Sequence, residues 1–119
     1  MIRRGWMAGG LIGAVLLFAG TPDARAAGEE IGEVIALDNE SVIVALLTFP
    51  PGSVAEQHTN PVPELGIILE GELTLITPAG REVLKAGTVR WLDPLTPHET
   101  RNEGTVPVKM WALLLKKSR

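Results

Sequence analysis

The 119-residue chain is predicted to be a small all-β protein, built as a sandwich or a barrel. Short runs rich in Val, Ile and Leu recur along the chain from residue 33 onward, which is typical of strands. Its 9 prolines and 13 glycines lie largely between these runs, apart from glycines near the N-terminus. No segment after residue 26 has the 3.6-residue apolar repeat of a helix. Seven or eight short strands at regular spacing account for this pattern.

The first 26 residues are predicted to be a signal peptide that is removed on export. Arg3 and Arg4 supply the positive start, residues 7–19 are apolar, and Ala24 and Ala26 supply the small residues of a cleavage site. A membrane anchor is the rival interpretation, but it needs about 20 apolar residues and this run is shorter. The mature protein is therefore expected in the periplasm or outside the cell, without a membrane anchor. The arginine pair also resembles a weak twin-arginine export signal.

Cleavage would leave residues 27–119, enough for one domain. That mature chain has 8 Lys and Arg against 13 Asp and Glu, a net charge of −5. An acidic surface without a basic run repels nucleic acid and anionic lipid, so neither is an expected partner. The chain has no cysteine, which excludes disulfides, a thiolate nucleophile and a cysteine zinc site.

The strands follow from apolar runs and the turn residues between them. Asp38-Asn39-Glu40 is a plausible hairpin turn, and Pro50-Pro51-Gly52 ends the second run of that pair. Glu70-Gly71 and Pro78-Ala79-Gly80 mark two further turns. The expected strands are 33–37, 41–49, 65–69, 72–77, 82–84, 88–92, 98–101 and 106–115.

The only two histidines lie in two spaced motifs. The first motif is Gly52-x5-His58-x-Asn60-x3-Glu64-x6-Gly71, and the second is Gly87-x10-His98-x3-Asn102. Two imidazoles and a carboxylate are donors that divalent Fe, Mn, Ni, Cu and Zn accept. A lone histidine is usually just a polar or packed residue, but this combination favours a metal site. The glycines are interpreted as turn formers without a chemical role.

These two motifs resemble those of the cupin superfamily, small jelly-roll barrels with a metal pocket inside. Asn60 stands where the first family motif has a second histidine, and Asp93 and Leu95 replace a proline and a glycine of the second. The resemblance covers residues 52–115. It implies a single jelly-roll, or double-stranded β-helix, domain over 27–119, with motif 1 at 52–71 and motif 2 at 87–102.

The resemblance implies that His58, Glu64 and His98 hold one divalent metal ion. Two histidines and one carboxylate with open positions are the arrangement associated with non-haem iron. If residue 58 lies in a strand, Asn60 shares its face, because side chains at i and i+2 point the same way. Asn60 would then add a weak carbonyl-oxygen ligand, orient a ligand residue or a metal-bound water by a hydrogen bond, or do neither. The alternative is a degenerate cupin that has lost the metal.

Two further expectations concern the tryptophans of the mature chain. Trp91 is expected to line the pocket, because the opposite strand phase would bury Arg90, which is costly without a partner. The run 106–115 is apolar on both faces, and it contains Trp111. An outer sheet face should be polar, so we expect this strand to be covered by a second subunit in a homodimer, as is common among similar small cupins.

Three functions are compatible with these residues. The first is an oxygen-using, dioxygenase-like oxidoreductase acting on a small organic substrate at the metal. The second is a non-catalytic, metal-dependent module that binds a small acid or sugar. The third is a structural or sensory cupin without metal. One fold hosts many functions, so the family does not choose between them, and no catalytic residue beyond the ligands is identified.

Overall fold

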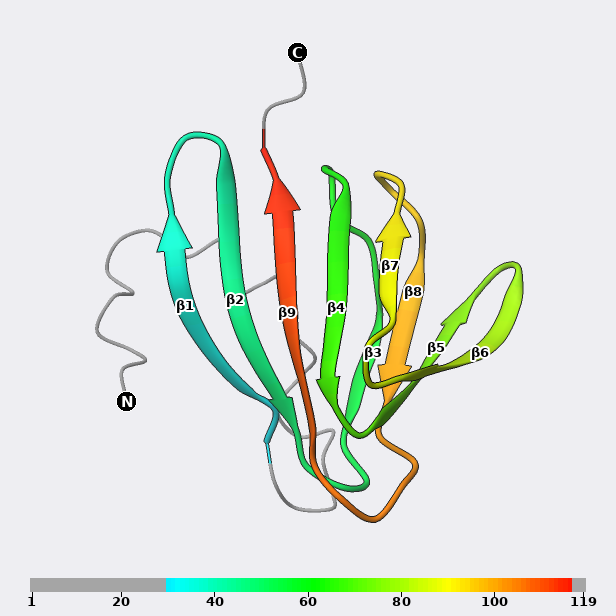
Figure 1. Ribbon diagram of the computed structural model, residues 1–119. Coiled ribbons are helices and arrows are strands. Elements are labelled where there is room, and N and C mark those ends of the chain that lie inside the picture. The colour runs from blue at the N-terminus through cyan, green and yellow to red at the C-terminus, as the bar shows by residue number, and fades with distance from the viewer. Residues whose placement is uncertain (1–29, 117–119) are drawn as a thin grey trace.

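The computed structural model describes residues 30–116, so the predicted signal peptide at 1–26 lies outside the described part of the chain. Residues 30–116 form nine strands that are arranged in two facing antiparallel sheets (Figure 1). The strands are β1 (Gly32–Asp38), β2 (Val42–Phe49), β3 (Val54–His58), β4 (Glu64–Glu70), β5 (Glu72–Thr77), β6 (Gly80–Lys85), β7 (Val89–Leu92), β8 (His98–Arg101) and β9 (Val108–Leu115).

The chain alternates between the two sheets as it advances. The five-stranded sheet has the order β1-β2-β9-β4-β7, and the four-stranded sheet has the order β3-β8-β5-β6. Strands β2 and β3 are consecutive in the chain but lie in different sheets, as do β4 and β5. This crossing produces a double-stranded β-helix, so the predicted all-β jelly-roll fold is confirmed.

The core lies between the sheets because alternate side chains of each strand point inward. Strand β9 alternates strictly between buried and half-buried positions along its eight residues. The buried apolar residues come from both sheets and form one cluster. Its members are Ala45, Leu47, Phe49, Ala55, Ile68, Leu73, Leu75, Leu84, Leu92, Val108, Met110 and Ala112.

Each of the eight predicted runs overlaps one strand of the structure, and one further strand, β3, was not predicted. Strand β3 was not among the expected strands, because its sequence VAEQH follows two prolines and a glycine and has only two apolar residues. The predicted hairpin at 38–40 joins β1 to β2, where the side chain of Asn39 accepts hydrogen bonds from the N–H groups of Ser41 and Val42. Asn60 lies beyond the end of β3, in the loop that leads to β4.

The expected position of Trp91 was wrong. Its side chain lies on the outer face of β7 with 46% of its surface exposed, while Arg90 lines the interior. Burying Arg90 is less costly than expected, because its side chain remains one-third exposed and lies beside Glu82. The indole N–H of Trp91 donates to Asp93 Oδ1 at 3.0 Å outside the barrel.

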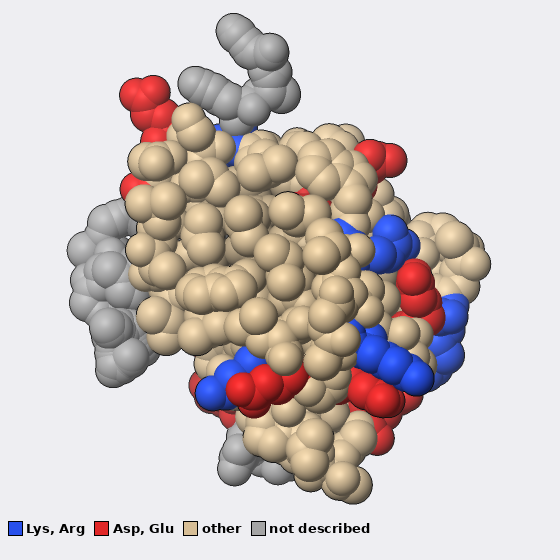
Figure 2. All heavy atoms as spheres, viewed as in Figure 1, with Lys and Arg blue, Asp and Glu red and all other residues tan. Residues whose placement is uncertain are grey.

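The outer face of the five-stranded sheet is apolar across all its strands. Figure 2 shows few charged side chains over the middle of this sheet. The strand register places ten apolar residues there in two rows: Val34, Leu46, Trp111, Ile67 and Val89 in one, and Leu37, Val44, Leu113, Leu65 and Trp91 in the other. Between residues 30 and 116 there is no helix long and apolar enough to span a membrane.

Candidate metal centre

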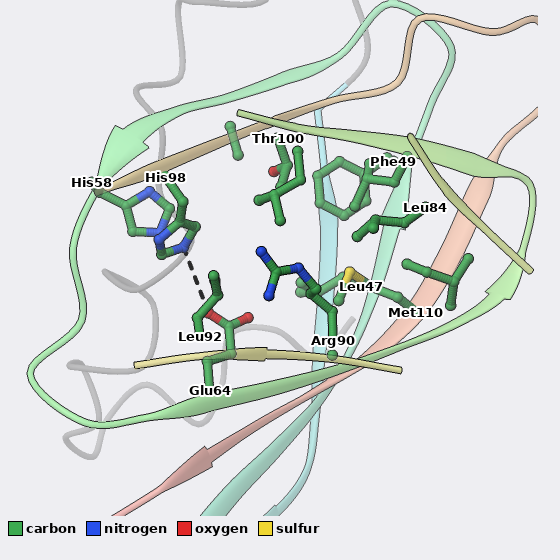
Figure 3. A pocket seen from close by; sticks show the side chains of 15 residues that line it. Leu47, Phe49, His58, Glu64, Leu84, Arg90, Leu92, His98, Thr100 and Met110 are labelled. Atoms are coloured by element: carbon green, nitrogen blue, oxygen red, sulfur yellow. Dashed lines mark ion pairs between the residues drawn. The ribbon is translucent and has the colours of Figure 1, made fainter. Parts of the chain in front are cut away.

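The barrel contains a small cavity of about 40 Å³ that opens to solvent at its mouth. It has room for a few water molecules or a very small ligand, and a larger ligand would extend through the mouth. Most of the lining is aliphatic or aromatic, and it is contributed by both sheets (Figure 3). Its polar side chains are His58, Glu64, Arg90, His98 and Thr100. The cavity is therefore an apolar chamber with a few convergent polar groups.

Two strands bring the histidines together. His58 ends β3 and His98 begins β8, and the two residues are register partners in the four-stranded sheet. A bulge between Ala55 and His58 shifts the alternation, so both of these residues face the cavity although they are three positions apart. The imidazole ring centroids are 4.4 Å apart. The two histidines predicted to share a site thus do lie side by side.

Both imidazoles are oriented in the same way by the backbone. His58 Nδ1 lies 2.8 Å from the carbonyl oxygen of Glu56, and His98 Nδ1 lies 2.9 Å from that of Thr96. A carbonyl oxygen only accepts, so each Nδ1 carries the hydrogen and each neutral ring keeps a lone pair on Nε2. The Nε2 atom of His58 is buried without a hydrogen-bond partner among residues 30–116. Metal-binding histidines are commonly fixed through their second nitrogen in this manner.

Glu64 reaches the same site from the five-stranded sheet. It is the first residue of β4, it is buried, and its Oε1 lies 3.6 Å from His98 Nε2 (Figure 3). The side-chain amide of Asn60 donates to this same oxygen at 2.9 Å. Asn60 is buried, and its Oδ1 has no partner among the described residues. Asn60 therefore positions the carboxyl group of Glu64 and leaves one oxygen unpaired inside the protein.

Burial disfavours the charged forms of both Glu64 and His98. Burial raises the pKa of Glu64 to about 7, and the hydrogen bond from Asn60 lowers it in part. Burial also lowers the pKa of His98, a hydrogen bond to the Thr96 carbonyl raises it, and the nearby His58 lowers it. Although the two side chains are at ion-pair distance, both shifts oppose an ion pair, and we describe them as a neutral pair.

The side chains of His58, His98 and Glu64 contact one another in pairs, but their donor atoms do not surround one common point. Within residues 30–116, no three His, Asp or Glu side chains are close enough together to hold an ion as they stand. The buried, unpaired Nε2 of His58 and the neighbouring carboxyl group of Glu64 nevertheless fit the chemistry of a divalent metal. Side-chain rotation is needed to direct all three donors at one ion.

Arg90 was missed as a cavity residue by sequence reasoning. Its guanidinium projects into the cavity on the side of Glu64 and His98 (Figure 3). The available signal was the alternation with Leu92, whose apolar side chain belongs inside. Thr100, two residues after His98 on β8, was missed as well, although strand alternation places it on the same face.

Asn102, the last residue of the second motif, has a structural role. Its side-chain amide donates to the carbonyl oxygens of Phe49 and Val106, both at 2.8 Å, and its Oδ1 accepts from Gly104 N–H at 2.9 Å. Its backbone exchanges hydrogen bonds with Gly52 and Ser53. Asn102 therefore connects the β2–β3 and β8–β9 segments at the end of the barrel away from the cavity polar groups.

The fold and this site define a cupin. The family model described as a cupin domain matches residues 45–115, and the chain belongs to that family. No curated protein matches the chain.

Solved structures agree with this assignment. A cupin superfamily protein from Desulfitobacterium hafniense has a TM-score of 0.70 at 18% identity, covering 78% of this chain and 84% of its own. A Klebsiella pneumoniae protein with a double-stranded β-helix domain has a TM-score of 0.69 at 19% identity, covering 86% of each chain. A protein of Thermotoga maritima, described as a predicted oxalate decarboxylase, has a TM-score of 0.68 at 25% identity, covering 73% and 81%.

Proposed function

We propose that this chain is an exported cupin that holds one divalent metal ion inside its barrel and takes a small organic ligand at that ion. The observation that carries the proposal is the shared orientation of His58 and His98, whose Nδ1–H groups are bound to backbone carbonyls beside a buried carboxyl group. The apolar segment at residues 7–19 supports export.

The roles of the residues follow from their chemistry. His58 and His98 would donate through Nε2, and Glu64 would donate through its carboxylate after losing its proton. Asn60 would hold Glu64 in place, since its amide already donates to Oε1. When bound, the ion would supply a Lewis acid that polarises an oxygen of the ligand. The apolar walls would exclude water from the rest of the ligand.

Titration of the metal-free protein with Co²⁺ or Zn²⁺, followed by calorimetry, tests this proposal. We expect one ion per chain in the wild type and loss of stoichiometric binding in His58→Ala, Glu64→Ala and His98→Ala. Glu72→Ala is the matched control, because it removes an exposed carboxylate outside the cavity. Equal binding by the wild type and the Glu64→Ala variant would contradict the proposal.

Asn60 provides a finer test. Its hydrogen bond lowers the pKa of Glu64 and fixes the carboxyl group. We expect Asn60→Ala to weaken metal binding about 10- to 100-fold, the usual effect of losing a residue that orients a ligand. Unchanged affinity in the same titration would show that Asn60 serves only the loop.

A dioxygenase-like oxidoreductase is the second candidate. Two histidines and one carboxylate leave coordination positions open, and that donor composition favours it. Against it, among residues 30–116 the other polar side chains lining the cavity are Arg90 and Thr100, and neither is an ordinary acid or base. An oxygen electrode separates the two functions. The enzyme requires oxygen uptake in step with substrate added to the Fe(II)-loaded protein, whereas the binding module consumes none.

A further inference from the structure

We infer that Arg90 makes the cavity selective for a carboxylate, and that the ligand is a small carboxylic acid with an apolar body. This inference rests on the proposed function, because it takes the barrel cavity as the ligand site. It goes further by separating an acid from a neutral ligand such as a sugar.

The strand register places Arg90 on the inner face of the barrel. On β7, Val89 and Trp91 are exposed, so Arg90 between them faces inward. Its partner on β4 is Gly66, which has no side chain. The same inner row continues through Ala112 and Ala45 on the next two strands. The side chain of Met110 covers Gly66, since a Cβ atom there would lie 2.9 Å from Met110 Cε, and Ala45 and Ala112 are fully buried. The guanidinium of Arg90 projects into the cavity that Gly66 and Met110 help to line (Figure 3).

Most of the guanidinium donors remain available. Its Nη1 donates to the backbone oxygen of Trp91 at 2.8 Å. Its Nε lies 3.3 Å from Glu82 Oε1 but is buried without a hydrogen bond to any described residue. Arginine has five N–H donors in a planar fork that matches the two oxygens of a carboxylate. A carboxylate in the cavity would therefore use donors that the protein itself leaves unpaired.

The neighbouring rows show what else the ligand would contact. Glu64 lies two residues before Gly66 on β4, so its row is adjacent to that of Arg90. Diagonal neighbours of this kind have Cα atoms about 7–8 Å apart, which a small molecule can bridge. On the other side of Arg90 the row is Leu47, Met110 and Ile68. The carboxylate would lie near the metal centre, and an apolar body would pack against that second row.

The charges also favour an anion. With the proposed metal bound, the ion and Arg90 carry three positive charges, whereas Glu64 and Glu82 carry two negative charges. A monocarboxylate would neutralise the remaining charge inside an apolar chamber, where an unbalanced charge is costly. A neutral ligand would leave the site charged and the guanidinium donors unpaired.

Binding of benzoate and benzamide tests the inference, because the two probes share their shape and differ in charge. Affinities are measured by NMR titration for the metal-free and the Zn²⁺-loaded protein. We expect the wild type to prefer benzoate by about tenfold or more, the usual effect of a charge-assisted hydrogen bond. Arg90→Met should abolish this preference, while Arg90→Lys should retain part of it. Glu72→Gln is the control and should retain the preference, since it removes an exposed carboxylate outside the cavity.

The outcomes separate this inference from the proposed function. Equal affinities of the wild type for the two probes would overturn the role of Arg90. A preference that persists in Arg90→Met would also overturn it, because the metal alone would then recognise the carboxylate. Metal affinity is measured separately, and absence of metal binding by the wild type would refute the proposed function. Arg90→Met should bind metal at least as tightly as the wild type, because it loses a nearby positive charge and no ligand.

Discussion

The buried side-chain amide of Asn102 stabilises the chain segments at one end of the barrel. Its side chain satisfies two carbonyl oxygens and one N–H group, all from loops at one end of the molecule. We expect Asn102→Ala to lower the free energy of unfolding by about 3 kcal/mol, because several buried polar groups lose their partner at once. Chemical denaturation measures the change.

Asn39 provides the matched control for this prediction. Its side-chain oxygen also accepts two backbone hydrogen bonds, but it lies in an exposed hairpin turn where water can replace them. Asn39→Ala should cost about 1 kcal/mol or less. Equal costs for the two variants would mean that burial of the Asn102 network does not matter.

Glu64 should make the metal-free protein less stable as the pH rises. Its pKa in the folded protein is about 7, above its ordinary value of 4.5, because it is buried. The folded state therefore keeps a proton that the unfolded chain has already lost, and this stabilisation is complete below pH 4.5 and lost through pH 7. We expect the stability difference between wild type and Glu64→Gln to change by on the order of 1–3 kcal/mol between pH 4.5 and pH 8.

Comparison with Glu64→Gln is needed because His98 acts in the opposite direction. Its lowered pKa means that stability is lost as the pH falls below the ordinary value of 6.5. Subtracting the denaturation curves of the variant from those of the wild type, in the presence of a chelator, isolates Glu64. A difference that does not vary with pH would show that Glu64 is not buried as a neutral acid.

At the scale of the elements, the turn between β4 and β5 tolerates no side chain. Gly71 has a φ angle of +82°, and a Cβ atom there would lie 2.7 Å from the carbonyl oxygen of Pro107. Gly71→Ala therefore adds a backbone clash to the strain of the left-handed conformation, and we expect a cost of about 3 kcal/mol or more. Gly87 is the control, since it also has a positive φ but open space around it. Gly87→Ala should cost only about 1–2 kcal/mol in the same thermal unfolding experiment.

The elements also show what the sequence can and cannot predict. The hairpin at 38–40 and the strand β9 were predictable, because turn residues and apolar runs are local signals. Strand β3 was not predictable from the sequence, because it has few apolar residues and a bulge between Ala55 and His58 interrupts their alternation. The inward direction of Arg90 follows the alternation with Leu92, but its ion pair with Glu82, which lies in the other sheet, has no local signal in the sequence.

The candidate site divides in the same way. The motifs brought His58, Glu64 and His98 to one cavity as expected, because their spacing is characteristic of the family. A role for Asn60 in orienting a ligand residue was among the expectations, but its hydrogen bond to Glu64 could not be specified, since it depends on the path of a loop. Whether the three residues bind a metal stays a prediction.

At the scale of the whole molecule, the outer face of the five-stranded sheet is expected to bind a second copy of the chain. Its ten apolar residues span all five strands, and a contiguous apolar face of this kind marks an interaction surface. We expect the protein to sediment as a dimer at about 10 μM, a concentration at which stable interfaces persist. Leu113→Glu should yield monomers, because it places a charge at the centre of one row.

The control for this experiment is Val83→Glu. Val83 is 51% exposed and belongs to β6 in the other sheet. This variant should remain dimeric, since it adds the same charge away from the apolar face. A wild-type protein that sediments as a monomer would show that the face is left uncovered or is occupied by something else.

The central claim is that the cavity holds one metal ion through His58, Glu64 and His98. Elemental analysis of the protein purified from its native compartment without chelators tests it most directly. We expect one divalent ion per chain in the wild type and no bound ion in the double variant His58→Ala/His98→Ala. A wild-type protein without metal, or a double variant with as much metal as the wild type, would contradict it.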